Sequence, residues 1–231
     1  MLSLSRKIEP ATAREISRTM KQLGEKPKLA ASIMATHRAN IKKILDRQYM
    51  ATFDLFGTRT LEAAQKALAG TRQVTEAAVE YARKHGAVAV TEITGTTQSQ
   101  AMKIITDATA AGLTEGLSEI EIARNIQAQI EESSGTLSRL RSRVIARTET
   151  HGAMGAANEA AAVATGLPLM KEWVAASGER TRPDHAAASG QKVHLDKPFK
   201  VGADSLMYPG DPAGSAKQIV NCRCASVHIV S

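Results

Sequence analysis

The distribution of proline is the feature that most constrains this chain. Five of the seven prolines lie between residues 168 and 212, and the other two are Pro10 and Pro27. Proline lacks a backbone donor and interrupts helices and central strands. Long helices are therefore favoured before residue 168, and short elements joined by loops after it. The sequence predicts an α+β fold, with a mostly helical N-terminal part followed by a small α+β C-terminal domain of short antiparallel strands.

Apolar residues recur at helical spacing through the N-terminal part. The spacing predicts helices over about residues 10–24, 29–56, 58–85, 98–112, 118–130 and 137–165. Pro10 suits a first helical turn, and Ser118 with Glu121 has the pattern of a capping box. The small residues from Gly152 to Ala164 permit close backbone approach, so we expect this tract to pack tightly.

The segments expected to interrupt or follow these helices are of several kinds. A break is predicted around Pro27, and TGTT at 94–97 predicts a turn. The segment 87–93, AVAVTEI, is compatible with a short strand or a helix end, because so short an apolar run has no clear period. Residues 131–135 predict a helix end and a domain boundary. After residue 168, the segments 169–175, 191–195 and 220–230 are expected to be strands.

The positive charge of the chain is confined to its N-terminus. There are 30 Lys and Arg against 23 Asp and Glu, and residues 1–50 alone hold 11 basic and 4 acidic residues, which equals the whole net charge of +7. The clearest cluster lies on the second predicted helix and consists of Arg38, Lys42, Lys43 and Arg47. It can contact nucleic acid, an anionic membrane or an acidic protein, or it can be a solvated helix face.

The sequence also argues against a membrane-spanning, a secreted or a disulfide-stabilised protein. No run approaches the roughly 18 apolar residues of a membrane span, and the start lacks the apolar core of a signal peptide. We therefore expect a cytosolic protein without a membrane span. Cys222 and Cys224 are the only cysteines and stand one residue apart, so no disulfide framework holds the fold.

An ordered series of short motifs carries a family resemblance. It consists of ARTET at 146–150, Asn158, Trp173, ERTRPDH at 179–185, Gly190, Phe199, YPGDP at 208–212 and NCRC at 221–224. In this order the motifs resemble the phage head morphogenesis family, the minor head proteins similar to the F protein of phage Mu. The resemblance covers about residues 138–225. Ser189 and Gly178 depart from it, because members often carry acidic residues near these positions.

The resemblance implies a virion structural protein that is not an enzyme. Proteins of this family associate with the portal vertex in few copies and can enter the capsid interior beside packaged DNA. We therefore expect several copies per virion, in the head or at the portal vertex, after synthesis in the host cytoplasm during assembly. Residues 136–231 would form the Mu F-like domain. Residues 1–135 would form a helical region whose basic end contacts portal protein, major capsid components or double-stranded DNA.

The family motifs also supply the residues expected to shape the C-terminal domain. Trp173 is expected to anchor its core, because one tryptophan in an aromatic-poor chain offers unusually large burial. Asn221 is expected to satisfy backbone groups in a turn. The full set of structural motif residues is Arg147, Glu149, Asn158, Trp173, Arg180, Arg182, Asn221 and Arg223.

A metal site is the most specific chemical hypothesis. Cys222 and Cys224 alternate with Arg223, so on a strand both sulfurs point to one side. With His185 and His194 they form a set of two sulfurs and two nitrogens that suits tetrahedral zinc. Such a structural zinc ion would join the last strand to the loop after Trp173. Alternatively, the two cysteines are small buried hydrophobic residues.

Two other functions stay open at this point. Arg182 and His185 could bind phosphate or transfer protons, which with Cys222 and Cys224 would suit a metal- or phosphate-directed hydrolase. In the simpler interpretation, Arg182 pairs with a carboxylate such as Glu149 or Glu172. The basic N-terminal helices alone would suit a non-specific DNA-binding protein.

Overall fold

The computed structural model describes residues 2–26, 29–63, 67–115 and 117–230. The break expected at Pro27 lies outside these residues. Two compact units are present, and each is considered by itself. The helical unit comprises Arg6–Asp46 and Gly86–Ile145, and the C-terminal unit comprises Met1–Ser5, Arg47–His85 and Ala146–Ser231.

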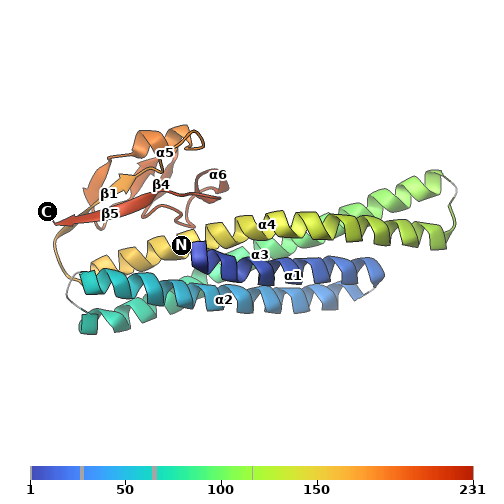
Figure 1. The fold of residues 1–231 in the computed structure, drawn as a ribbon, viewed down its shortest axis with the longest axis horizontal. Helices are drawn as coiled ribbons and strands as arrows, with labels where there is room; N and C mark the ends of the chain where they lie inside the picture. Colours follow the sequence, from blue (N-terminus) through green and yellow to red (C-terminus); the bar gives the residue numbers. More distant parts are fainter. Residues whose placement is uncertain (1, 27–28, 64–66, 116, 231) are drawn as a thin grey trace. The chain divides into compact units, whose positions relative to one another are not determined.

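Four long helices precede the first strand (Figure 1). They are α1 (Leu2–Glu25), α2 (Ala30–Ala63), α3 (Ala67–Thr114) and α4 (Glu119–Ala164). Helix α1 begins well before Pro10, so the prediction that this proline lies in a first turn is wrong. Pro10 is exposed, and water can therefore solvate the carbonyl that loses its donor. Among the described residues, no helix combines the length and apolarity needed to cross a membrane.

The helix interruptions predicted at TGTT and at residues 131–135 are wrong, because both segments lie inside helices. The TGTT segment lies inside α3, where Thr96 and Thr97 donate their hydroxyl hydrogens to the carbonyls of Glu92 and Ile93 at 2.7 and 2.8 Å. The hydroxyls thus find acceptors within the helix itself. Residues 87–93 belong to the same helix, and α4 continues through residues 131–135. The functional division at residue 135 stays a prediction.

The helical unit has a small apolar core and several buried polar side chains. Leu23, Met34 and Ala101 pack together as buried residues. The fully buried ring of His37 lies with its Nδ1 atom 3.1 Å from Oε1 of Glu15. At the start of α4 the predicted capping box is confirmed: the Ser118 backbone N–H donates to the Glu121 carboxylate at 2.8 Å, and the Ser118 hydroxyl does so at 2.6 Å.

Within the C-terminal unit, the small-residue tract of α4 is packed as the sequence predicts. Ala153, Ala157 and Ala161 are fully buried. A methyl group added at Gly155 would lie 2.5 Å from the ring of Tyr208, so only glycine permits this approach. The tract therefore forms a close contact surface for the segment that contains YPGDP.

The strands form two small antiparallel sheets. In the first, β1 (Leu169–Val174) lies between β2 (Lys192–His194) and β5 (Ala225–Val230), and the neighbouring strands β1 and β5 are visible in Figure 1. The second is a hairpin of β3 (Phe199–Val201) and β4 (Asp204–Leu206). The α+β class and the short antiparallel strands are thus confirmed.

Two short helices, α5 (Pro183–Ala188) and α6 (Ala216–Ile219), complete this part of the chain. Its apolar core contains both cysteines, and its members are Trp173, Ala188, Phe199, Val201, Leu206, Cys222 and Cys224.

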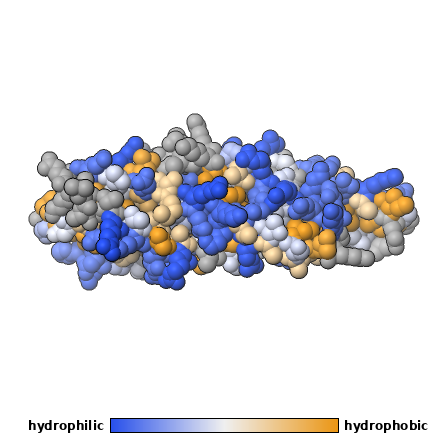
Figure 2. Space-filling model, turned by 90° about the horizontal axis from the view of Figure 1, so that it is seen from below, coloured by the Kyte–Doolittle hydropathy of each residue, from blue (hydrophilic) through white to orange (hydrophobic). Residues whose placement is uncertain are grey.

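The surface is mostly polar where Figure 2 shows it. Hydrophilic residues cover much of that face, and hydrophobic residues form small separate groups. Arg38, Lys42, Lys43 and Arg47 are all exposed on α2. Lys42 forms an ion pair with Asp46 at 2.5 Å, so part of its charge is already compensated within the helix.

Candidate metal centre

Both cysteines lie on a loop between α6 and β5. The last strand begins only at Ala225, so the prediction of a strand from residue 220 is wrong for its first five residues. Asn221 has a positive φ of 55°, which asparagine tolerates better than most residues. The Cys222 N–H donates to the Ile219 carbonyl at 3.1 Å. This turn, rather than strand alternation, sets the directions of the two thiols.

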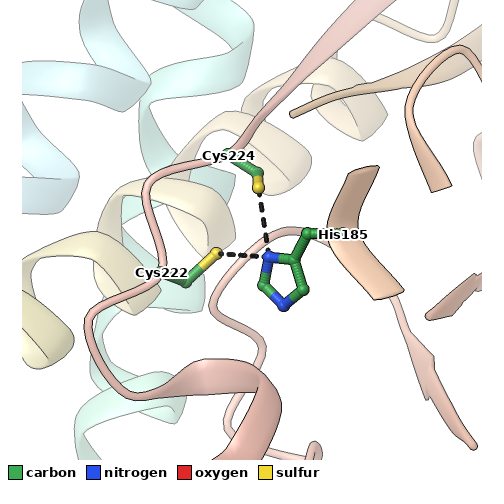
Figure 3. A group of neighbouring side chains, drawn as sticks. All are labelled: His185, Cys222 and Cys224. Atoms are coloured by element: carbon green, nitrogen blue, oxygen red, sulfur yellow. Dashed lines mark hydrogen bonds between the residues drawn. The ribbon is translucent and has the colours of Figure 1, made fainter. Parts of the chain in front are cut away.

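His185 is the third member of the group, and helix α5 supplies it. Its Nδ1 atom lies 3.2 Å from the Cys224 sulfur and 3.8 Å from the Cys222 sulfur (Figure 3). All three side chains are buried, and their potential ligand atoms lie within 4.8 Å of one another. The Trp173 ring packs edge-on against the imidazole with 5.6 Å between centroids. The core tryptophan therefore helps to fix the orientation of the histidine ring.

The two thiols differ strongly in acidity. A hydrogen bond from Cys222, the largest cause, and one from the Ala176 backbone stabilise the Cys224 thiolate and lower the pKa of Cys224 to about 5. The contact with Cys224, together with burial, raises the pKa of Cys222. One thiol thus ionises readily, while a second negative charge beside it is unfavourable unless a cation compensates both.

His194 does not lie in this group. It stands on β2 opposite Met170, is exposed, and borders a different cavity with Leu195 and Asp196. The four-residue ligand set predicted from sequence is therefore reduced to three side chains. Strand β2 pairs with β1, and this register holds His194 at the sheet rather than at the cysteine loop.

An arginine-rich cavity opens beside the group. It has a volume of about 540 Å³, and His185 and Cys224 form part of its wall. Its charged lining residues are Arg147, Glu179, Arg180, Arg182 and Arg223. Arg182 donates from Nη2 to the Val220 carbonyl; the expected pairing with Glu149 or Glu172 is not found among the described residues.

The ARTET motif connects α4 to two other segments. Thr148 Oγ1 accepts the backbone N–H of Asn221 at 3.1 Å, which ties the helix to the cysteine loop. The Glu149 carboxylate accepts the Tyr49 hydroxyl at 2.5 Å. Arg147 lines the cavity, so it and Glu149 serve different neighbours, as residues two apart on a helix must. The neighbour of Glu149 is helix α2.

Asn158 lies about two and a half turns beyond Glu149 on α4 and also faces α2. Its side-chain Oδ1 accepts the Thr60 hydroxyl at 3.0 Å. Gln48 donates to Thr150 Oγ1 at 2.8 Å in the same helix pair. Polar motif residues of α4 therefore hold α2 by side-chain hydrogen bonds within the C-terminal unit.

Comparison with known proteins identifies the family. The sequence profile of the Phage Mu protein F like protein family matches residues 103–227, more than half of the chain. The chain belongs to this family. The match includes the cysteine loop, His185 and the arginine-lined cavity, whereas the basic residues 38–47 lie outside it.

Two curated relatives cover the same share of the chain. The minor head protein GP7 of Bacillus phage SPP1 is 30% identical over 128 residues, which are 53% of this chain and 39% of that protein. The NAD(+)–arginine ADP-ribosyltransferase EFV of Enterococcus faecalis is 31% identical over 126 residues, 54% of this chain and 25% of that protein. The chain thus matches less than half of either relative's length. No solved structure matches it significantly.

Within the family-matched region, the sequence analysis missed several polar residues. Gln218 Oε1 lies 3.0 Å from His185 Nε2, and Gln218 Nε2 donates to Asp184 Oδ2 at 2.6 Å. Lys171 is fully buried on β1 and donates to Glu159 at 2.5 Å. Lys171 and Trp173 are two apart on a strand and share its buried face. Strand alternation could therefore have identified the lysine, but not its partner.

Proposed function

We propose that this protein is a minor head protein in phage head morphogenesis, bound at the portal vertex or the capsid interior near packaged DNA. The observation that carries the proposal is the family match over residues 103–227, together with the likeness to minor head protein GP7. The protein would reside in the virion in several copies, after assembly in the host cytoplasm.

The contacts of the motif residues support an architectural role rather than catalysis. Glu149 binds Tyr49, Asn158 binds Thr60, and Arg182 binds the Val220 backbone carbonyl. Each of these polar groups joins segments that are distant in sequence. A hydrolase that uses Arg182 and His185 is less favoured, because both side chains already have such structural partners. The transferase activity in the name of EFV belongs to a protein of which this chain matches only 25%.

The exposed basic residues of α2 are the proposed partner-contacting surface. Arg38 and Lys43 lie outside the family-matched region and are exposed. Surface charge of this kind attracts acidic protein surfaces and DNA phosphates. Several copies around one vertex would add avidity, so each contact can be weak.

Co-purification with the portal protein encoded in the same genome tests the proposal. The full chain should co-purify with the tagged portal, and the double change Arg38→Glu with Lys43→Glu should weaken that association. Arg72→Glu with Lys103→Glu is the matched control, since it reverses two exposed charges on α3. If the folded chain associates with neither portal nor capsid protein, the proposal is wrong.

DNA contact is tested separately. Binding of the full chain to double-stranded DNA should weaken steeply as salt is added, because phosphate contacts release counterions. Reversal of Arg38 and Lys43 should flatten that dependence, while the α3 control should not. Affinity that is independent of salt would contradict the phosphate contact and leave portal or capsid protein as the partner of this surface.

A further inference from the structure

The spacing of three buried side chains fits the dimensions of a zinc site. Zinc bonds of about 2.3 Å to sulfur and 2.0–2.1 Å to nitrogen place tetrahedral ligands about 3.5 Å apart for a sulfur–nitrogen pair. The observed separations of His185 Nδ1 from the sulfurs of Cys224 and Cys222 are 3.2 and 3.8 Å. Sub-ångström shifts would therefore bring the three atoms onto one tetrahedral face (Figure 3).

The hydrogen-bond network of His185 presents the correct nitrogen. Asp184 can only accept when ionised, so the side-chain amide of Gln218 donates its N–H to Asp184 and turns its oxygen towards His185. That oxygen requires a donor, which places the imidazole proton on Nε2. The lone pair of Nδ1 in the neutral ring is then directed at the two sulfurs. A metal-bound imidazole usually donates its other N–H to a carboxylate, a backbone carbonyl or water, and the Gln218 side-chain oxygen is the equivalent acceptor for His185.

The cysteine loop is held in place before any metal binds. The Asn221 N–H donates to Thr148, and the Val220 carbonyl accepts from Arg182. These contacts fix the residues immediately before Cys222. The two sulfurs are therefore already ordered before a metal ion binds. Because little further conformational entropy is lost on binding, this arrangement favours tight metal binding.

The elements around the three side chains are short, so a metal ion that joins them would stabilise this part of the chain. Residues 169–230 contain only short strands and two helices of 6 and 4 residues. These elements form part of the larger C-terminal unit, in which a metal ion would join two segments that are distant in sequence. His185 and the cysteines come from α5 and from the loop before β5, and they lie inside the apolar core with Trp173 and Phe199.

We propose that His185 Nδ1, Cys222 Sγ and Cys224 Sγ bind one Zn²⁺ ion that joins α5 to the chain entering β5. The donor set of two soft sulfurs and one imidazole favours zinc over magnesium or calcium. Each coordinated thiol releases its proton to solvent, so the bound thiolates neutralise the dication. The described residues bring no fourth histidine, cysteine or carboxylate into the group. Water from the adjoining arginine-lined cavity supplies the fourth ligand.

The test uses the full chain, prepared without chelator and analysed for bound metal. One zinc per folded chain is expected. Replacement of zinc by Co²⁺ should give visible tetrahedral d–d bands and a near-ultraviolet thiolate-to-cobalt charge-transfer band. Cys222→Ser and Cys224→Ser should each lose the metal or weaken its binding by at least about 100-fold, since a ligand change should exceed the 10- to 100-fold effect of a second-shell change. His194→Asn is the matched control, because His194 is exposed and outside the group.

Any one of three results would overturn the proposal. The first is folded wild-type protein that binds neither Zn²⁺ nor Co²⁺ in stoichiometric amount when reduced and supplied with metal. The second is a cobalt spectrum without thiolate charge transfer, and the third is metal binding that both serine variants retain. If a serine variant fails to fold, the wild-type cobalt spectrum still decides, because it reports directly whether sulfur is a ligand.

Discussion

The Nε2 atom of His185 lies 3.0 Å from Oε1 of Gln218, although 33 residues separate the two in sequence. This contact fixes which imidazole nitrogen faces the cysteines. We predict that Gln218→Leu weakens Co²⁺ and Zn²⁺ binding by about 10- to 100-fold, the usual effect of a lost support behind a metal-bound histidine. Competition with a chelator of known affinity measures the change.

The control for this prediction is Lys217→Ala. Lys217 also contacts Asp184, at 3.2 Å, but its side chain is exposed and its ammonium group bonds to Asp184 and not to His185. Its removal should change metal affinity by less than about 3-fold, because an exposed ion pair contributes little. Equal losses in both variants would contradict a specific role for Gln218.

The buried ion pair of Lys171 and Glu159 is expected to dominate the stability of the first sheet. Lys171→Met leaves the buried Glu159 carboxylate with only the His228 ring, 3.4 Å away, as its partner, and should lower the free energy of unfolding by about 3–5 kcal/mol. Adding Glu159→Gln should restore part of the loss, because the uncompensated charge is removed. Lys192→Met is the control on the neighbouring strand. Its exposed pair with Glu172 should be worth less than about 1 kcal/mol in the same denaturant titration.

Two helical glycines should respond oppositely to alanine. Gly155→Ala places a methyl group 2.5 Å from Tyr208 and 2.9 Å from the Pro209 carbonyl, which should destabilise the protein by about 1–3 kcal/mol. Gly135→Ala has open space around it and should stabilise α4 by about 0.5–1 kcal/mol. Thermal unfolding followed by circular dichroism measures both. Stabilisation by Gly155→Ala would contradict the close packing of the small-residue tract.

Burial of His151 predicts a loss of stability in mild acid. Burial, and to a smaller extent the charge of His185, lowers the pKa of His151 from 6.5 to about 4. The unfolded chain therefore binds this proton more readily, and stability falls as the pH drops from 6.5 to 4. Over this range the pKa shift lowers the free energy of unfolding by about 3 kcal/mol. Urea titrations at pH 7 and pH 4 should show a smaller difference for His151→Phe than for the wild type, whereas His194→Asn should behave like the wild type.

Local sequence rules succeeded where partners are close in the chain. The capping box of Ser118 and Glu121 depends on residues three apart, and it forms as predicted. The same rules failed at TGTT. Threonine hydroxyls can bond to the backbone of a turn or of a helix, and the sequence does not show which of the two forms; Thr96 and Thr97 bond to carbonyls within α3. Gly135 likewise does not end α4, because the cost of one glycine, about 1 kcal/mol, is too small to interrupt a long helix by itself.

The metal-binding group was only partly predictable. The family motifs and residue chemistry drew attention to His185, Cys222 and Cys224, which the structure brings together. They also suggested His194, which strand pairing places opposite Met170 instead. Gln218 carried no sequence signal, and Asp184 lies in ERTRPDH without any sign of its contact with Gln218, because that contact depends on how α6 packs beside α5. Long-range packing of this kind cannot be derived from spacing along one chain.

The amount of this protein in purified phage heads is the most direct test of the central claim. Quantitative mass spectrometry of assembled heads should find the chain in several copies per particle. Wild-type heads that contain none of it, while the folded protein stays free in the lysate, would contradict its role as a minor head protein.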